Sequence, residues 1–153
     1  MNTQMKRIVI RSPIKNHNYL DVVIRFDKSL FEALLPRFPD VKLRRFDGSK
    51  KGDKVVLHFY IGIKVATWVS EITDDWAEND TAGFIDIGIK LPFPLKYWKH
   101  RHVVENATGG CVIVDEIEFS TGRAWLNALM LPLLKSQFAK RTSLYQHYFN
   151  EIQ

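Results

Sequence analysis

Four residues that could carry acid–base chemistry lie in the second half of the chain. His100 and His102 are two residues apart in a segment of alternating character, and Asp86 and Asp115 belong to the segments before and after it. Alternate residues of a β-strand point to the same face, so both histidines are expected to share one face. A histidine beside a carboxylate can orient a polar ligand group or transfer a proton, which makes these four the candidate catalytic residues.

The register of the expected strands brings the same residues together. If the turn between the last two strand segments is centred on Thr108, His102 lies opposite Asp115. A similar count across the preceding proline-containing loop places Asp86 roughly opposite His100. Facing residues have Cβ atoms about 5 Å apart. The sequence therefore predicts a polar ladder of these two aspartates and two histidines inside an otherwise apolar groove.

Two other interpretations of the ladder stay open. Two histidines at this spacing are commonly surface or core residues, and a buried acid must find a partner whatever its function. His100, His102 and Asp115 could also supply three ligands, the number that catalytic zinc sites use. Their match to a zinc site is loose, so we expect neither a metal nor another cofactor.

The elements that must position these residues follow from the hydrophobic period. Residues 8–10 are β-branched and predict a strand. Asn18 and the capping box Ser29–Glu32 predict two short helices between residues 18 and 35. From residue 41 the period changes to two, which is typical of half-buried strands. We expect an antiparallel meander of strands at 41–44, 54–64, 66–73, 82–89, 96–105 and 111–119, with an acidic loop at 73–81.

Beyond Gly122 the apolar residues recur every three or four positions, from Trp125 to Ile152. This period predicts one long amphipathic helix of about thirty residues, about 45 Å in length. A helix this long and apolar needs a sheet to pack against.

This order of elements, and several short segments, resemble the START-like, helix-grip superfamily known as SRPBCC, which includes polyketide cyclases. The chain is most similar to the bacterial "ligand-binding SRPBCC domain" proteins. The segments that carry the resemblance are SLFEAL (29–34), RFDG (45–48), FIDIG (84–88), LPFPLKYWKH (91–100) and DEIEFS (115–120).

The resemblance implies an α+β fold in which a curved antiparallel sheet of about seven strands wraps around a long C-terminal helix, with residues 1–153 forming a single domain. It also implies an internal cavity for an apolar or amphipathic small molecule, and no shared catalytic motif. The residues expected to line that cavity are Phe59, Trp68, Phe84, Asp86, Trp98, His100, His102, Asp115, Ile117, Phe119, Met130, Leu134 and Phe138.

Composition limits the remaining possibilities. The chain has 153 residues, of which 46% are hydrophobic and 25% charged, as in ordinary globular proteins. No apolar run is long enough to span a membrane. Cys111 is the only cysteine, and the N-terminus lacks the features of a secretory signal, so we expect a cytoplasmic protein. A homodimer is compatible with the sequence.

Three classes of function follow. The first is a non-catalytic binder of a hydrophobic or amphipathic small molecule, which we favour. The second is an enzyme in the same cavity, a polyketide cyclase/dehydratase-, aromatase- or hydrolase-like acid–base catalyst. The third is a nucleic-acid or protein-interaction module that uses Lys96, Lys99, Arg101 and the lysine-rich loop 50–54. The net charge of +5 is modest and scattered, so we expect no nucleic-acid partner.

Overall fold

A seven-stranded antiparallel sheet dominates the fold. The computed structural model describes residues 5–151, and within them the strand order is β1-β7-β6-β5-β4-β3-β2. The strands are β1 (Lys6–Lys15), β2 (Asp40–Phe46), β3 (Lys54–Ile61), β4 (Lys64–Glu78), β5 (Thr81–Lys90), β6 (Tyr97–Ala107) and β7 (Gly110–Ser120). Strands β2 to β7 form the predicted meander, and β1 pairs with β7 at its edge.

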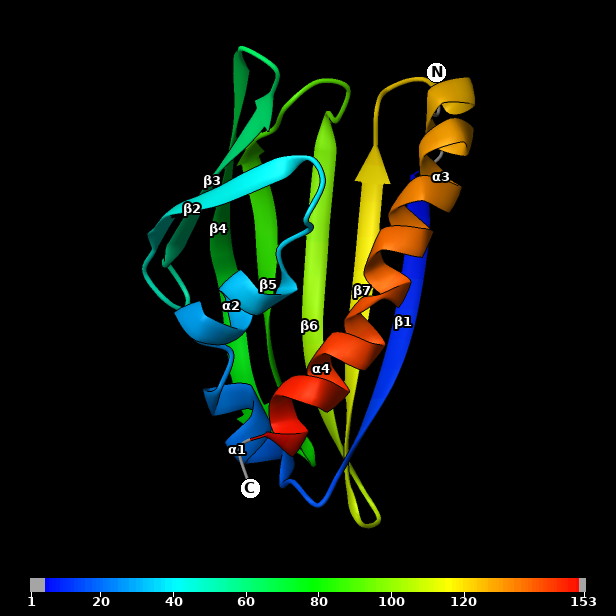
Figure 1. The fold of residues 1–153 in the computed structure, drawn as a ribbon. Coiled ribbons are helices and arrows are strands. Elements are labelled where there is room, and N and C mark those ends of the chain that lie inside the picture. The colour runs from blue at the N-terminus through cyan, green and yellow to red at the C-terminus, as the bar shows by residue number, and fades with distance from the viewer. Residues whose placement is uncertain (1–4, 152–153) are drawn as a thin grey trace.

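Four helices pack on one side of this bent sheet (Figure 1). Helices α1 (Tyr19–Ile24) and α2 (Lys28–Leu34) connect β1 to β2, and α3 (Ala124–Ala139) and α4 (Arg141–Asn150) follow β7. The predicted helix-grip order, with two short helices after the first strand and a helical C-terminus, is therefore confirmed. Within the described residues, no helix is both long and apolar enough to cross a membrane.

Side-chain caps fix the start of both short helices. The Asn18 side chain accepts a hydrogen bond from the Leu20 amide, as the sequence predicted for an N-cap. The capping box proposed at Ser29 is wrong, because Asp27 caps α2 by accepting from the Leu30 amide. Asp27 lies two residues earlier and serves as well as serine at this position, so the residue pattern alone did not separate the two.

The acidic segment 73–81 is not the loop that its composition predicted. β4 continues through it to Glu78 and pairs with β5 from Val69 to Glu78. The reversal is confined to Asn79 and Asp80, both with positive φ, which these two residue types tolerate better than most. Polar composition misled the prediction because one face of this hairpin is open to solvent.

The predicted single C-terminal helix is divided in two. α3 ends at Ala139 and α4 begins at Arg141, and the two run end to end across the sheet in Figure 1. Lys140 between them keeps a helical backbone, with φ −66° and ψ −21°. Tyr145 and Phe149 of α4 are buried in the core beneath α1 and α2. Ile152, the last apolar residue of the predicted helix, lies outside the described residues.

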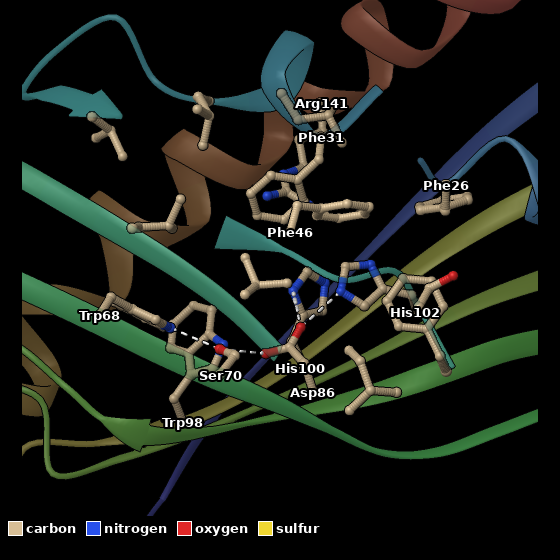
Figure 2. Close-up of a pocket in the computed structure, with 18 of the residues that line it drawn as sticks. Phe26, Phe31, Phe46, Trp68, Ser70, Asp86, Trp98, His100, His102 and Arg141 are labelled. Atoms are coloured by element: carbon tan, nitrogen blue, oxygen red, sulfur yellow. Dashed lines mark hydrogen bonds and ion pairs between the residues drawn. The ribbon is translucent and has the colours of Figure 1, made fainter. Parts of the chain in front are cut away.

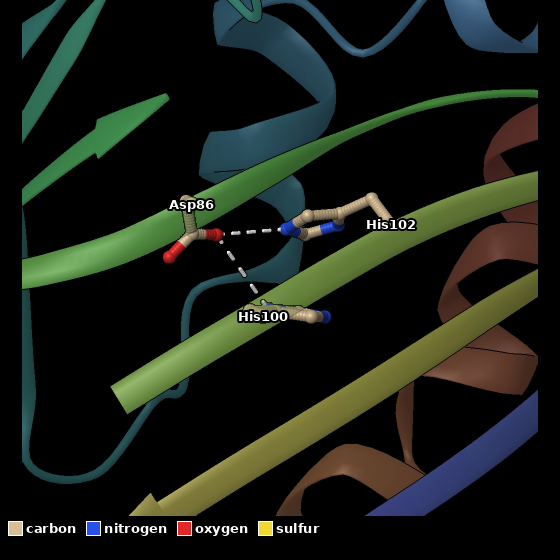
Figure 3. A group of neighbouring side chains, drawn as sticks. All are labelled: Asp86, His100 and His102. Atoms are coloured by element: carbon tan, nitrogen blue, oxygen red, sulfur yellow. Dashed lines mark hydrogen bonds and ion pairs between the residues drawn. The ribbon is translucent and has the colours of Figure 1, made fainter. Parts of the chain in front are cut away.

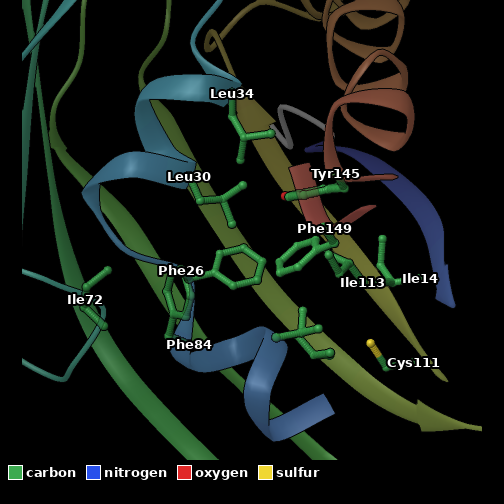
Figure 4. Close-up of a cluster of buried hydrophobic side chains, with 12 residues drawn as sticks. Ile14, Phe26, Leu30, Leu34, Ile72, Phe84, Cys111, Ile113, Tyr145 and Phe149 are labelled. Carbon is green, nitrogen blue, oxygen red and sulfur yellow. The ribbon is translucent and has the colours of Figure 1, made fainter. Parts of the chain in front are cut away.

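Two buried clusters flank the middle of the molecule. One joins α1, α2 and α4 to the sheet and includes Leu30, Ile113, Tyr145 and Phe149 (Figure 4). The other lies under α3. Its buried members are Ile8, Leu95, Trp98, Ile117, Phe119 and Phe138.

Asn127 anchors α3 to the end of β7. The side chain is fully buried, and its Oδ1 accepts hydrogen bonds from both the backbone amide and the hydroxyl of Thr121, each at 2.7 Å. These contacts hold the first turns of α3 close to the sheet at one end. α4 is held at the other end by its core residues.

Candidate functional site

An internal cavity of about 200 Å³ lies between the sheet, the α2–β2 segment and the junction of α3 with α4. Figure 2 shows that aromatic rings surround much of it. Trp68 and Trp98 meet edge to face at 4.9 Å between ring centroids, and Phe138 of α3 lies 5.8 Å from Trp98. The walls are therefore mainly apolar and flat, and Ser70, Asp86, His100 and His102 form a polar wall on the sheet side.

Nine of the residues that the sequence predicted for the cavity line it. They are Phe59, Trp68, Phe84, Asp86, Trp98, His100, His102, Leu134 and Phe138.

The other four lie outside the cavity lining. Ile117 and Phe119 are fully buried in the cluster under α3, and Met130 packs against that same cluster. Asp115 is also fully buried and lies behind the histidines. These side chains pack between the C-terminal helices and β7 instead of toward the cavity, which strand parity could not reveal.

The predicted register of the polar residues is confirmed. His100 is paired with Asp86 on β5 and with Ile117 on β7, and His102 is paired with Asp115. The hydrogen bonds run diagonally across these pairs: His100 Nε2 bonds Asp115 Oδ1 at 2.8 Å, and His102 Nε2 bonds Asp86 Oδ2 at 3.0 Å. The two imidazole rings are stacked, with centroids 3.6 Å apart.

Asp86 joins the histidines to the indole side of the cavity. Its Oδ1 accepts from the Ser70 hydroxyl at 3.3 Å, and the Ser70 oxygen accepts from Trp68 Nε1 at 2.8 Å (Figure 2). The chain Trp68–Ser70–Asp86–His102 thus runs along one wall. It fixes the Asp86 carboxylate with both oxygens in use.

Asp115 collects donors from the sheet and from α4. Besides His100, the Tyr145 hydroxyl donates to its Oδ1 at 3.3 Å, and Arg141 Nη1 lies 3.5 Å from the same oxygen. Arg141 also lines the cavity and packs over Phe138. The buried carboxylate is therefore compensated by a cation and by neutral donors, as a charge in this position requires.

Burial and pairing set the protonation states. Burial, with the charge of His102 as the next cause, lowers the pKa of His100 to about 4, so its ring is neutral at neutral pH. Burial acting alone would raise the pKa of Asp115. The hydrogen bond from His100 and the nearby Arg141 guanidinium instead hold that pKa below its usual value. Burial also raises the pKa of Tyr145, which remains a hydrogen-bond donor.

A metal could be held by a different trio from the one that the sequence suggested. Asp86, His100 and His102 present one ligand atom each, and these atoms all lie within 4.8 Å of one another (Figure 3). Asp115, the carboxylate considered from the sequence, instead bonds the far nitrogen of His100.

Sequence reasoning missed several residues of the site. Arg141 lies three residues after Phe138, on the same side of the helical segment, and that spacing was a usable signal. Ser70 lies two residues after Trp68 in β4 and was likewise detectable by strand parity. Phe26, Phe31 and Phe46 come from the α1–α2 connection, from α2 and from β2. No local pattern placed these phenylalanines opposite the sheet.

Solved structures share the whole fold at low sequence identity. A norcoclaurine synthase variant from Thalictrum flavum matches with a TM-score of 0.70 and 15% identity over 99% of this chain and 98% of that one. Another structure of that enzyme is a complex with dopamine and hydroxybenzaldehyde. Ara h 8.0201 matches with a TM-score of 0.65 and 15% identity over 97% and 98% of the two chains. The Zhui aromatase/cyclase from a Streptomyces species matches with a TM-score of 0.63 and 12% identity over 96% and 94%.

The chain has the helix-grip fold that these structures share. No family model matches the sequence, and no curated protein matches it either. At these identities the structural likeness establishes the fold and not the activity. The cavity lies between the sheet and the helical segments that cover it.

Removing the Asp115 carboxylate should destabilise the protein strongly. In Asp115→Ala, the buried donors of His100, Tyr145 and Arg141 lose their acceptor, and breaking a buried pair costs about 3–5 kcal/mol. Urea denaturation would measure this change in the free energy of unfolding. Glu116→Ala is the matched control, because Glu116 pairs with Arg7 and Arg101 on the outer face and should contribute at most about 1 kcal/mol. Similar losses in the two variants would contradict the role given to Asp115.

Proposed function

We propose that the protein binds a small amphipathic molecule, with an apolar and preferably aromatic body, in the cavity beneath α3 and α4. The observation that carries the proposal is a mainly apolar, aromatic cavity whose sheet side presents Ser70, Asp86, His100 and His102. Apolar pockets with a few convergent polar groups are the usual form of small-molecule sites.

The cavity volume favours a small ligand. About 200 Å³ is below the range of roughly 300–1,000 Å³ that is typical of pockets for drug-sized molecules. A single aromatic ring or a short branched chain suits this space. The structural neighbour that holds dopamine and hydroxybenzaldehyde makes small hydroxylated aromatics a sensible first set of probes.

The polar wall, formed on the sheet side by Asp86, His100 and His102, would orient the ligand. Arg141 lines the cavity from α4 and adds a cationic donor. A ligand hydroxyl or carbonyl can therefore be matched by these groups, and the apolar body lies against Trp68, Trp98 and Phe138.

Filling the cavity with a larger side chain should weaken ligand binding. Leu134 lines the cavity from α3, whereas its neighbour Leu133 is 66% exposed and lies outside the lining. With chelator-treated protein, Leu134→Trp should lower the affinity for a monocyclic phenol at least tenfold, which corresponds to about 1.4 kcal/mol. Leu133→Trp should leave it unchanged. Isothermal titration calorimetry would measure both, and native mass spectrometry of freshly purified protein would report any ligand carried through purification.

Equal affinities in the two tryptophan variants would argue against binding in this cavity. So would the absence of affinity for every apolar or aromatic probe tested, provided that circular dichroism shows a folded protein.

Acid–base catalysis in the same cavity is the second candidate function. The observation that favours it is the presence of two histidine–carboxylate hydrogen bonds on the polar wall, one of which uses the cavity-lining Asp86. Two of the structural neighbours are a synthase and an aromatase/cyclase. In this reading His102 and Asp86 would exchange a proton with the bound molecule, in a cyclase-like reaction.

A further inference from the structure

Three potential ligand atoms converge on the polar wall, one from β5 and two from β6 (Figure 3). Asp86 Oδ2 lies 3.0 Å from His102 Nε2 and 3.8 Å from His100 Nδ1. Two ligands that are each about 2.1 Å from a tetrahedral zinc ion lie about 3.4 Å apart. The two separations from Asp86 fall on either side of that value, and all three ligand atoms lie within 4.8 Å of one another.

The hydrogen-bond directions leave an unfilled position between two acceptors. A carboxylate can only accept, so the hydrogen shared by His100 and Asp115 is on His100 Nε2. In a neutral imidazole the other nitrogen, Nδ1, then carries a lone pair. His100 Nδ1 is 3.8 Å from Asp86 Oδ2, a second acceptor, whose present partner is His102 Nε2. A cation between them would satisfy both.

Two buried atoms behind the trio, on the side of Asp115, have no hydrogen-bond partner among the described residues. They are His102 Nδ1 and Asp115 Oδ2. If His102 Nε2 binds a metal, the ring proton moves to Nδ1, which lies 3.6 Å from Asp115 Oδ1. Asp115 would then face the outer nitrogen of both histidines. Metal-bound histidines usually donate that second N–H to a carboxylate, a carbonyl or water.

We propose that Asp86, His100 and His102 bind a divalent transition-metal ion at the polar wall of the cavity. Two imidazoles and one carboxylate suit zinc or ferrous iron, and the remaining coordination positions would open into the cavity. Arg141 lies beside Asp115, so Asp86 is the carboxylate that offsets the charge of the ion. The site does not depend on which organic molecule the cavity takes.

Metal titration of tag-free, chelator-treated protein tests this proposal. We expect one Co²⁺ ion per chain, with the visible absorption of a low-symmetry site, and displacement by Zn²⁺. His102→Gln and Asp86→Asn should each weaken binding at least a hundredfold, because each removes a ligand. His147→Gln is the control, since His147 is exposed on α4 and distant from the trio.

Absence of stoichiometric binding would overturn the metal site, and so would unchanged affinity in both ligand variants. Asp86→Asn preserves the shape of the side chain, so it remains informative if His102→Gln fails to fold. The comparison of Leu134→Trp with Leu133→Trp uses metal-free protein. Failure of the metal site and failure of the ligand site can therefore be told apart.

A second and independent feature lies at one end of the sheet. Strands β3, β5 and β7 run in the same direction, so the β3–β4 turn, the β5–β6 loop and the start of α3 meet at that end (Figure 1). Ile63 in the turn is fully exposed, Phe93 in the loop is 90% exposed and Trp125 in α3 is 64% exposed. Other exposed apolar side chains in these segments are Ile61, Val65, Ile89 and Leu129.

The same three segments carry positive charge only. Segments 61–65, 89–96 and 121–129 contain Lys64, Lys90, Lys96 and Arg123, and they contain no aspartate or glutamate. All four cations are exposed, and the structure shows no ion pair for them within the described residues. Exposed apolar groups and unpaired cations in the same segments complement a surface that is apolar beneath a layer of negative charge.

From this charge pattern we infer that this end docks on anionic lipid bilayers. The side chains of Ile63, Phe93 and Trp125 would enter the boundary between headgroups and acyl chains, and the four cations would face lipid phosphates. Both contributions are needed, because these few apolar side chains alone would bind a bilayer weakly.

Vesicle co-sedimentation tests the docking surface. We expect binding to equimolar phosphatidylcholine–phosphatidylglycerol vesicles, weaker binding to phosphatidylcholine alone, and a decline as salt is added. Phe93→Asp and Trp125→Asp should each lower the partition coefficient at least tenfold. Ile24→Asp is the control, since Ile24 is 76% exposed on α1 at the opposite end. No binding to anionic vesicles, equal binding by the variants, or self-association through Phe93 without vesicle binding would overturn the inference.

Discussion

The buried carboxylate of Asp115 is the constraint on which the site depends. A charge in this position is tolerable only where several donors converge on it, and they come from β6 and from α4. The hydrogen bonds and the ion pair to Asp115 therefore fix both the orientation of the His100 ring and the position of α4 on the sheet. Arg141 and Tyr145 are four residues apart in α4, so one face of that helix brings both to the carboxylate.

The cavity exists because two well-packed clusters hold the helices apart from the middle of the sheet. The cluster around Tyr145 and Phe149 supports α4, and the cluster around Ile117 and Phe119 supports α3. Between them, large planar side chains such as Trp68 and Trp98 meet edge to face and leave space that smaller, flexible side chains would fill. The polar wall borders this space on the sheet side, so its polar groups face the cavity.

Charged groups are distributed by face. On the outer face of β1, β6 and β7, arginines pair with Glu105 and Glu116, which keeps that side of the sheet solvated. The inner face carries only charges that are compensated locally. The end formed by the β3–β4 turn and the β5–β6 loop differs from both, because its cations have no acidic neighbours within those segments and its apolar side chains are uncovered. The outer face, the inner face and this end of the sheet therefore differ in charge and in exposure.

The sequence by itself determined most of the sheet and its register. Period-two alternation and one short turn were enough to place His102 opposite Asp115 and His100 opposite Ile117, because pairing in a hairpin is a local property. Alternation also separated Glu116 and Glu118 on the outer face from Asp115 on the inner one. Composition failed at residues 73–81, where an exposed strand resembles a loop.

Tertiary structure alone decided how the polar groups are partnered. The strand register places His100 opposite Asp86 and His102 opposite Asp115. The hydrogen bonds instead run diagonally, from His100 to Asp115 and from His102 to Asp86. The exclusion of Ile117, Phe119 and Met130 from the cavity, and the inclusion of Phe26 and Arg141, depended on where α1, α3 and α4 settle over the sheet. Such contacts join residues far apart in the chain, and they are set by the packing of whole elements, which no local period encodes.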